Sequence, residues 1–263
     1  FFLSIIFLFS VVTIAHPVYF NHLGVKDGLP QLSVHAIYQD ELGRLWFGTQ
    51  EGISVYNGEK ITNQTSHFQS ADGSINDYTV NNITGTSEGD VFFLIGNLLV
   101  RYDLRKDHFH ALKENVSSLQ KIRNKIYFSS SDSIFLWDLQ NREITFQRTI
   151  PIKSTITSIG KDYQERLWIG TKRGLYVTIG QTEDMQCVIP DEDISTIFES
   201  SNHDIWIGTR LNGLYCYSRD NKLIRFVSSN NSNSISHNYI RAIAEDESGN
   251  IWIGTFYGLN KYD

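Results

Sequence analysis

The stretch from Ile240 to Asp263 reads IRAIAEDESGNIWIGTFYGLNKYD. Its centre, Asp246 to Asn250, has turn chemistry, because Asp opens turns and Gly tolerates positive φ. Short segments rich in β-branched and aromatic residues flank this turn: one opens with Ile240, one runs from Ile251 to Thr255, and one runs from Leu259 to Tyr262. We therefore predict three short strands here, named A, B and C in chain order.

The same pattern recurs along the chain. Its core, Trp-x-Gly-Thr, begins at four positions: Trp46, Trp168, Trp206 and Trp252. An aliphatic residue stands twelve positions before each Trp, and a further Gly follows each Gly-Thr pair after two or three variable residues. Two of the copies add a fourth strand, D, at Ile61–Phe68 and at Lys222–Phe226.

Two weaker copies carry Phe92 and Tyr127 in the position of the Trp. The six anchors are Trp46, Phe92, Tyr127, Trp168, Trp206 and Trp252. Their spacing averages about 41 residues, the length of a four-stranded propeller blade. Such a sheet has two apolar faces, so blades must stack radially with the B-strand rings between them. We predict an all-β β-propeller of four-stranded antiparallel blades over residues 34–263, in which the Trp and Gly-Thr residues build core and turns.

The N-terminus differs in character from the rest of the chain. Residues 1–15 read FFLSIIFLFSVVTIA, without charge and short for a membrane span. We interpret them as a secretory signal peptide cleaved near Ala15; an uncleaved anchor or a buried strand is the alternative. Residues 16–33 then match a D strand and its connection to strand A, and we expect them to complete the last blade and close the ring. The start at Phe1 and the stop after a strand C suggest an N-terminal fragment with six blades or blade parts of a six- or seven-bladed ring, seven being favoured.

Composition and motifs argue against several classes of function. The 29 acidic residues against 23 basic ones speak against binding of nucleic acid. No nucleophile-elbow, zinc-protease or nucleotide-binding motif is present. His108 and His110 would share one face of a strand, but no third ligand is evident, so we expect no metal and no cofactor. Cys187 and Cys216 could pair in an exported chain, although we favour two unpaired, buried thiols.

Binding is better argued from the loops. The B–C and D–A connections of a propeller lie on the same face, and the B–C turns vary only between their fixed Gly-Thr and Gly. Variable loops on a rigid scaffold are typical binding positions. A glycan site needs planar hydrogen-bonding groups and an aromatic platform, and Arg also suits an acidic sugar. The candidate ligand-binding residues are Arg173, Arg210, Asn212, Phe256 and Tyr257; ordinary solvated loop residues are the alternative.

The repeat resembles that of the two-component regulator propeller family. The resemblance is carried by Ile243–Thr255, by Gly258–Asp263 and by the opening Asp27-Gly28-Leu29-Pro30. It extends over residues 18–263, strongly in four copies and weakly at residues 80–150. Such proteins are similar in layout: a signal peptide, periplasmic propellers, a small β-sandwich, a transmembrane helix and a cytoplasmic histidine kinase.

The resemblance implies a periplasmic sensor region of a hybrid two-component histidine kinase, of the type found in Bacteroidetes. Its ligand would be an oligosaccharide released from polysaccharides or another small periplasmic molecule, and the intact receptor would be a homodimer anchored by a helix beyond this chain. We expect no enzymatic activity in the chain itself. A secreted polysaccharide lyase or hydrolase, with carboxylates or His at the central pore, and a non-catalytic interaction propeller are the alternatives.

Overall fold

The computed structural model describes residues 22–64, 77–179, 184–231 and 233–262. The predicted signal peptide and most of the strand expected to close the ring fall outside these residues. Both stay predictions.

Antiparallel strands make up almost all the regular structure, and they form six separate sheets in chain order. Blade 1 contains β1 (Val34–Gln39), β2 (Leu45–Thr49), β3 (Gly52–Tyr56) and β4 (Ile61–Asn63). Blade 2 contains β5 (Val80–Gly85), β6 (Asp90–Ile95), β7 (Leu98–Asp103) and β8 (His108–Lys113). Blade 3 contains β9 (Val116–Ile122), β10 (Lys125–Ser130), β11 (Ser133–Asp138) and β12 (Glu143–Thr149).

Blade 4 contains β13 (Ile156–Lys161), β14 (Leu167–Thr171), β15 (Gly174–Thr178) and β16 (Met185–Pro190). Blade 5 contains β17 (Ile194–Glu199), β18 (Ile205–Thr209), β19 (Leu214–Tyr217) and β20 (Leu223–Phe226). Blade 6 contains three strands within the described residues: β21 (Ile240–Glu245), β22 (Ile251–Thr255) and β23 (Gly258–Tyr262). The strand B predicted at Ile251–Thr255 is confirmed to the residue.

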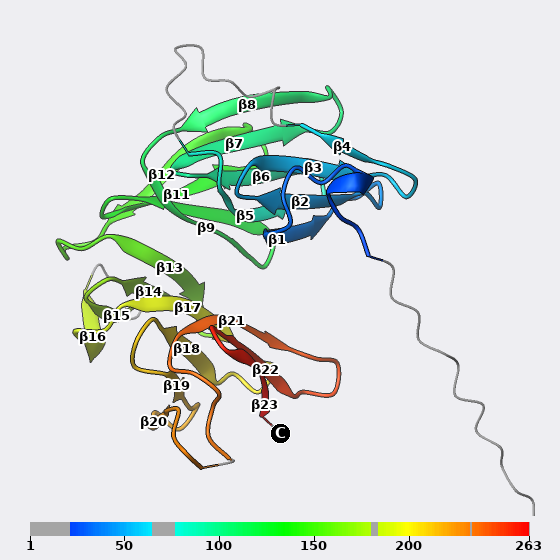
Figure 1. Cartoon of the computed structure of the whole chain (residues 1–263). Coiled ribbons are helices and arrows are strands. Elements are labelled where there is room, and N and C mark those ends of the chain that lie inside the picture. The colour runs from blue at the N-terminus through cyan, green and yellow to red at the C-terminus, as the bar shows by residue number, and fades with distance from the viewer. Residues whose placement is uncertain (1–21, 65–76, 180–183, 232, 263) are drawn as a thin grey trace, which may run out of the picture.

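The A strands of successive blades pack against one another, and the D strands lie at the periphery (Figure 1). This arrangement is that of a propeller, so the predicted fold class is confirmed. The packed pairs run from β1 and β5 through to β17 and β21. None of the main packed pairs in the described part of the chain joins a strand of blade 1 to a strand of blade 6. Seven blades in the intact ring stay a prediction.

One apolar cluster fills each of the five interfaces between neighbouring blades, and each contains one predicted anchor. In order along the chain these anchors are Trp46, Phe92, Tyr127, Trp168 and Trp206. They are 0–6% exposed, so both strong and weak copies of the repeat place a ring between blades. Trp252, the sixth anchor, is only partly buried, because no blade covers its face in the described structure.

The turn between strands A and B is organised by one carboxylate in blades 1, 4 and 6. Asp40, Asp162 and Asp246 each accept a hydrogen bond of 2.8 Å from the indole Nε1 of the following Trp. Each also accepts backbone N–H groups of its own turn. The Asp and the Trp of the repeat are therefore one structural unit.

The turn between strands B and C is fixed by the Thr and the second Gly of the repeat. Thr209 donates its hydroxyl to the carbonyl of Gly213 at 2.8 Å and accepts the N–H of Asn212. Gly213 has φ of 88°, and a Cβ there would lie 2.2 Å from the carbonyl oxygen of Phe226. Thr255 and Gly258 repeat this arrangement, with Tyr257 donating its N–H. The motif thus holds the variable middle residues in a set position.

Three details differ from expectation or refine it. Strand D of blade 1, β4, begins at Ile61 as predicted and runs to Asn63, and residues 65–68 of its predicted span lie outside the described residues. The two cysteines are unpaired, but only Cys216 is buried. Cys187 lies exposed on β16, an edge strand with no outer neighbour in the described part of the chain.

The described part of residues 16–33 contains a short 3-10 helix, η1 (Val25–Asp27), and no strand. Leu29 after it is 5% exposed and packs with Phe47 and Ile61 on blade 1. No helix within the described ranges is long and apolar enough to cross a bilayer.

Candidate functional site

Backbone hydrogen bonds join the D–A and B–C connections on one face of the molecule. The N–H of Phe256 donates to the carbonyl of Tyr239 at 2.9 Å, and the N–H of Arg210 donates to the carbonyl of Asp193 at the same distance. Since each bond links a B–C turn to the segment preceding strand A of the same blade, both kinds of loop present their side chains together. In blades 5 and 6 the two kinds of loop therefore lie together.

Four aromatic side chains gather on this face of blade 6: His237, Tyr239, Phe256 and Tyr257. We call them the loop-face cluster. The rings of Tyr239 and Phe256 are nearly parallel, at 5° with centroids 6.1 Å apart. His237 lies 5.6 Å from Phe256 and 5.8 Å from Tyr257.

Two arginines flank the loop-face cluster. The guanidinium of Arg241 lies 5.3 Å from the Tyr239 ring centre and 5.1 Å from that of Phe256. Arg210 of blade 5 donates from Nη1 to the Tyr239 hydroxyl at 2.7 Å, and its Nε lies 3.4 Å from Asp193 Oδ2. Arg210 is therefore held between a carboxylate and a ring. Arg241 is exposed, with no ion pair inside the described residues.

The exposure of the cluster is large for aromatic residues. Phe256 is 54% and Tyr257 74% exposed, although their rings contact one another at 5.6 Å. Exposed apolar area that is contiguous and rimmed by polar groups commonly marks a binding surface. Tyr and Arg are also the residue types that contribute most to binding in such patches. The cluster presents flat rings, hydrogen-bond donors and positive charge at one place.

Two predicted site residues lie apart from the cluster. Asn212 donates from Nδ2 to Glu192 Oε2 at 2.6 Å, and the Tyr215 hydroxyl donates to the other carboxylate oxygen. Burial, reinforced by that carboxylate, raises the pKa of Tyr215 and keeps its hydroxyl a donor. Asn212 therefore supports the loop from within. Arg173 belongs to the β14–β15 turn of blade 4, and no contact found in the described structure joins it to the cluster.

The structure thus brings together three of the predicted site residues, Arg210, Phe256 and Tyr257. It adds three that sequence reasoning did not single out: His237, Tyr239 and Arg241. A signal was available, because these three residues flank Ile240, the first aliphatic residue of strand A. No other strong copy has an aromatic residue immediately before that aliphatic: the positions hold Ser33, Thr155 and Asp193.

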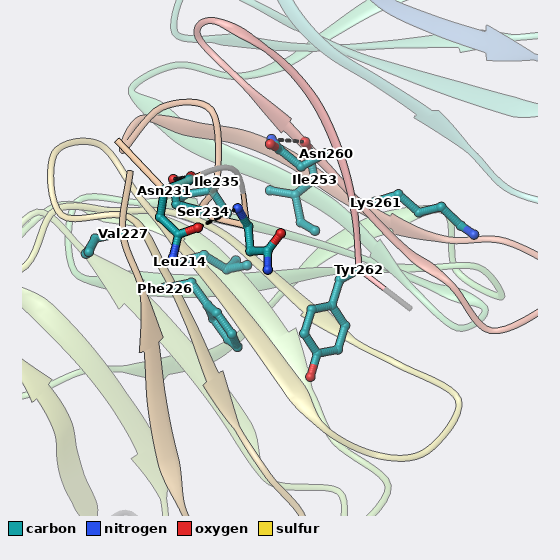
Figure 2. Close-up of a pocket in the computed structure, with 11 residues that line it drawn as sticks. Leu214, Phe226, Val227, Asn231, Ser234, Ile235, Ile253, Asn260, Lys261 and Tyr262 are labelled. Carbon is teal, nitrogen blue, oxygen red and sulfur yellow. Dashed lines mark hydrogen bonds between the residues drawn. The ribbon is translucent and has the colours of Figure 1, made fainter. Parts of the chain in front are cut away.

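A cavity of about 530 Å³ lies nearby, between blades 5 and 6 (Figure 2). Leu214, Phe226 and Ile253 give it an apolar base, and Asn231 and Ser234 contribute polar groups. It is lined on the other side by residues of β23, the last strand of the described structure. Its mixed lining suits a ligand with both apolar and polar faces.

The histidine pair considered as a metal site does share one face. The rings of His108 and His110 are 4.8 Å apart, and burial, followed by the positive charge of Arg101, lowers the pKa of His110. A neighbouring guanidinium opposes a bound cation. Within the described ranges no group of three or more His, Cys, Asp or Glu side chains is placed to hold a metal ion.

Three segments of the chain match the family described as two component regulator propeller: residues 28–51, 189–210 and 234–257. They cover strands A and B of blades 1, 5 and 6 and end at or in the B–C turn; the second also includes the end of β16 in blade 4. No curated protein matches the chain.

Solved structures share the fold. The extracellular domain of BT4673 of B. thetaiotaomicron, described as a putative one component and as a putative hybrid two component system, matches 87% of this chain with 20% identity and a TM-score of 0.59. That of the putative hybrid two component system BT3049, from the same organism, matches 92% with 20% identity and a TM-score of 0.53. This chain spans 38% and 41% of their respective lengths.

An enzyme also has this architecture. Virginiamycin B lyase from Staphylococcus aureus matches 87% of this chain and 83% of its own, with 14% identity and a TM-score of 0.62. At these identities the similarity concerns the fold alone, so function must be argued from the side chains.

Proposed function

Because the chain carries repeats of the two component regulator propeller family, we propose that it is the ligand-sensing propeller of a membrane-bound two-component sensor. In this role the chain lies outside the cytoplasm, binds an oligosaccharide and performs no catalysis itself. The signal would pass to a histidine kinase and a transcriptional output in the intact protein, which we propose to be a homodimer. Its periplasmic location follows from the leader predicted at residues 1–15.

The observation that carries this proposal is the loop-face cluster with its two arginines. Aromatic faces pack against the apolar faces of sugar rings, while guanidinium groups donate planar pairs of hydrogen bonds to hydroxyl or carboxylate oxygens. The Tyr239 and Phe256 rings are stacked on one another, and Tyr257 is the more exposed neighbour. A sugar ring would therefore contact Tyr257 and Phe256, with Arg241 at its edge.

The position of the cluster suits transmission of a signal. It lies at the junction of blades 5 and 6, where Arg210 of one blade donates to Tyr239 of the other. A ligand that contacts both blades changes the relative stability of their arrangements, and a differential affinity of a few kcal/mol is enough to shift such an equilibrium.

The test measures whether the chain binds members of a panel of neutral and acidic oligosaccharides, with thermal shift and calorimetry as the two readouts. We expect one class to raise the melting temperature. Tyr257→Ala should lower its affinity by about tenfold or more, as for a central aromatic contact. Phe146→Ala is the matched control, because Phe146 is a similarly exposed aromatic, at 59%, on the outer strand of blade 3. The proposal would be contradicted if no saccharide of the panel bound, or if Tyr257→Ala and Phe146→Ala lowered the affinity equally.

The lyase or hydrolase alternative predicts turnover. Incubation of the chain with the same panel, with products separated by size, distinguishes the two functions. Formation of shorter or unsaturated products would establish the enzyme and overturn the proposed sensor.

A further inference from the structure

The indole N–H of Trp206 is buried without an acceptor, unlike that of the other Trp anchors. In blades 1, 4 and 6 the Trp donates to the Asp six residues earlier. Blade 5 has Ser200 in that position, and the Ser200 hydroxyl donates to Asn202 and to the carbonyl of Asp204 instead. Trp206 is 3% exposed, and its Nε1 has no hydrogen-bond partner among the residues that the structure describes. A buried donor left unpaired costs about 1–3 kcal/mol.

A cavity of about 430 Å³ lies at this position. Trp206 and Ser200 both line it, together with residues of β19, β20 and the A–B turn of blade 6. Since the Trp side chains of the other blades direct Nε1 toward the residue that Ser200 replaces, and Ser200 lines this cavity, the free N–H lies beside the cavity wall, with its nitrogen buried. The volume is in the range of small-molecule sites.

The lining of the cavity specifies the chemistry of its occupant. Aromatic rings of Trp206, Phe226 and Tyr262 form one wall, with Trp206 and Tyr262 5.1 Å apart. The polar residues are Ser, Asn and two carboxylates, Asp204 and Glu245, and no Lys or Arg is among them. An anion would be repelled here, and an apolar ligand would leave the Trp206 N–H unpaired.

The two carboxylates already have donors. Glu245 accepts the N–H and the hydroxyl of Ser201 at 2.7 and 2.5 Å, and Asp204 accepts the N–H of Arg219 and the amide of Asn202. Each carboxylate oxygen can accept more than one hydrogen bond. A hydroxyl group fits this arrangement, because it accepts from the indole and donates to a carboxylate at once.

We propose that this cavity, between blades 5 and 6 on the face opposite the loop-face cluster, is a second binding site for a neutral monosaccharide or a similar polyol. Only the saccharide class rests on the proposed function; the unpaired Trp206 donor and the cavity do not. Cys216 in the wall is a neutral thiol there, since burial and the nearby Asp204 raise its pKa to about 12. It adds no further charge.

The test uses the chain with ¹⁵N-labelled tryptophan, titrated with D-glucose, D-galactose, D-mannose and D-xylose. We expect one of these sugars to shift the Trp206 indole N–H signal saturably. The Trp168 signal should stay in place, because its N–H is bonded to Asp162. D-glucuronate should bind at least about tenfold more weakly than its neutral parent, because of Asp204 and Glu245.

Ser200→Asn supplies the missing acceptor without adding charge, and its amide can donate to Asp204. We expect at least a tenfold loss of affinity and a folded protein. Trp206→Phe, which removes the donor but keeps a ring, as in blade 2, should have a similar effect. Ser87→Asn is the matched control, since Ser87 is exposed in the A–B turn of blade 2; it should bind like the parent chain.

The site is overturned if none of the four sugars shifts the Trp206 signal, or if Ser200→Asn and Trp206→Phe bind like the parent chain. Failure here differs from failure of the proposed function. If oligosaccharides still stabilise the protein through Tyr257 while Trp206 is unaffected, the sensor stands and the second site falls. If a monosaccharide reaches Trp206 but no oligosaccharide stabilises the protein, the second site stands and the proposed sensing function falls.

Discussion

A carboxylate at the start of the A–B turn ties the Trp indole to the backbone in three of the six described blades. Asp246 shows the arrangement at the edge of the structure, where it accepts from Asn250, from Trp252 and from the N–H groups of Ser248 and Asn250. These donors, the Asn250 amide first and the Trp252 indole next, hold the pKa of Asp246 well below its usual value of 3.8. Hydrogen bonding of the charged form is the cause.

This shift predicts a pH dependence. A carboxylate whose pKa is lower in the folded than in the unfolded chain stabilises the fold above its unfolded pKa, and this stabilisation is lost as the pH falls toward the folded value. Asp246→Asn should therefore lower the melting temperature at pH 6, and the gap to the parent chain should narrow between pH 5 and pH 3. The melting temperatures of both proteins at each pH are measured by thermal denaturation, with circular dichroism as the signal. A gap that stays constant down to pH 3 would contradict the assignment.

At the scale of the strand, the Gly of Trp-x-Gly-Thr marks where the next blade approaches. A Cβ on Gly48, Gly170 or Gly208 would lie 2.5–2.7 Å from the first aliphatic side chain of strand A in the following blade. A Cβ on Gly254, in blade 6, would meet nothing closer than 3.7 Å. The same motif therefore has a packing role in three blades, and in the fourth that role is not used within the described structure.

Gly208→Ala and Gly254→Ala form a matched pair that tests this packing. Gly208→Ala forces a methyl group against Ile240, and such overpacking costs about 1–3 kcal/mol. Gly254→Ala should leave the free energy of unfolding within about 0.5 kcal/mol of the parent, because space is available there. Urea unfolding followed by tryptophan fluorescence compares the two. If both variants lowered the free energy of unfolding equally, contact with the next blade would not explain why Gly occupies this position.

At the scale of the molecule, stability depends on contacts between neighbouring blades. Inner blades bury both faces of their sheets, whereas each terminal blade has one neighbour in the described structure. Leu29 partly covers the outer face of blade 1, but Ile37 on that blade remains 63% exposed. In blade 6, Leu259 is 66% exposed.

Amide hydrogen exchange should be faster in the terminal blades than in the inner blades. Because each repeat is stabilised by its neighbours, local opening starts at the ends of such an array. We expect the amides of β22 to exchange at least about tenfold faster than those of β10 and β14, although all three are B strands with paired neighbours. Mass spectrometry of peptic peptides measures the difference. Equal protection of the three strands would show that the blades open as one cooperative unit.

Much of the fold was predictable from residues close together in the sequence. Strand lengths, turns and the anchor positions depend on local alternation and on the Asp, Gly and Thr of each turn, which lie within about twenty residues of one another. Even Phe92 and Tyr127 were correctly placed: Phe92 keeps the spacing from the preceding aliphatic residue Val80, and Tyr127 follows Leu119 by a turn that is one residue shorter. The exposure of Cys187 was not predictable, since it depends on whether β16 has an outer neighbour.

The candidate site was predictable only in part. Phe256, Tyr257 and Arg210 could be chosen because the B–C turns vary between fixed residues. Tyr239, His237 and Arg241 join them through the backbone bond between Phe256 and Tyr239, which closes a loop of many residues. Asn212 lies apart from the cluster with its amide held by Glu192, a contact that becomes visible only when the loops are placed.

The sequence by itself determined the all-β repeat, the six blades, the anchor in each B strand and the loop face, because the interactions responsible are local and repeated. Only the tertiary structure decided which side chains meet: which Trp lies beneath a neighbouring blade, which aromatic residues form a cluster with arginines from two blades, and which buried indole N–H has no acceptor among the described residues. The physical reason is that these outcomes depend on contacts between blades and on single positions at which one blade departs from the repeat, such as Ser200, which stands where blades 1, 4 and 6 have Asp.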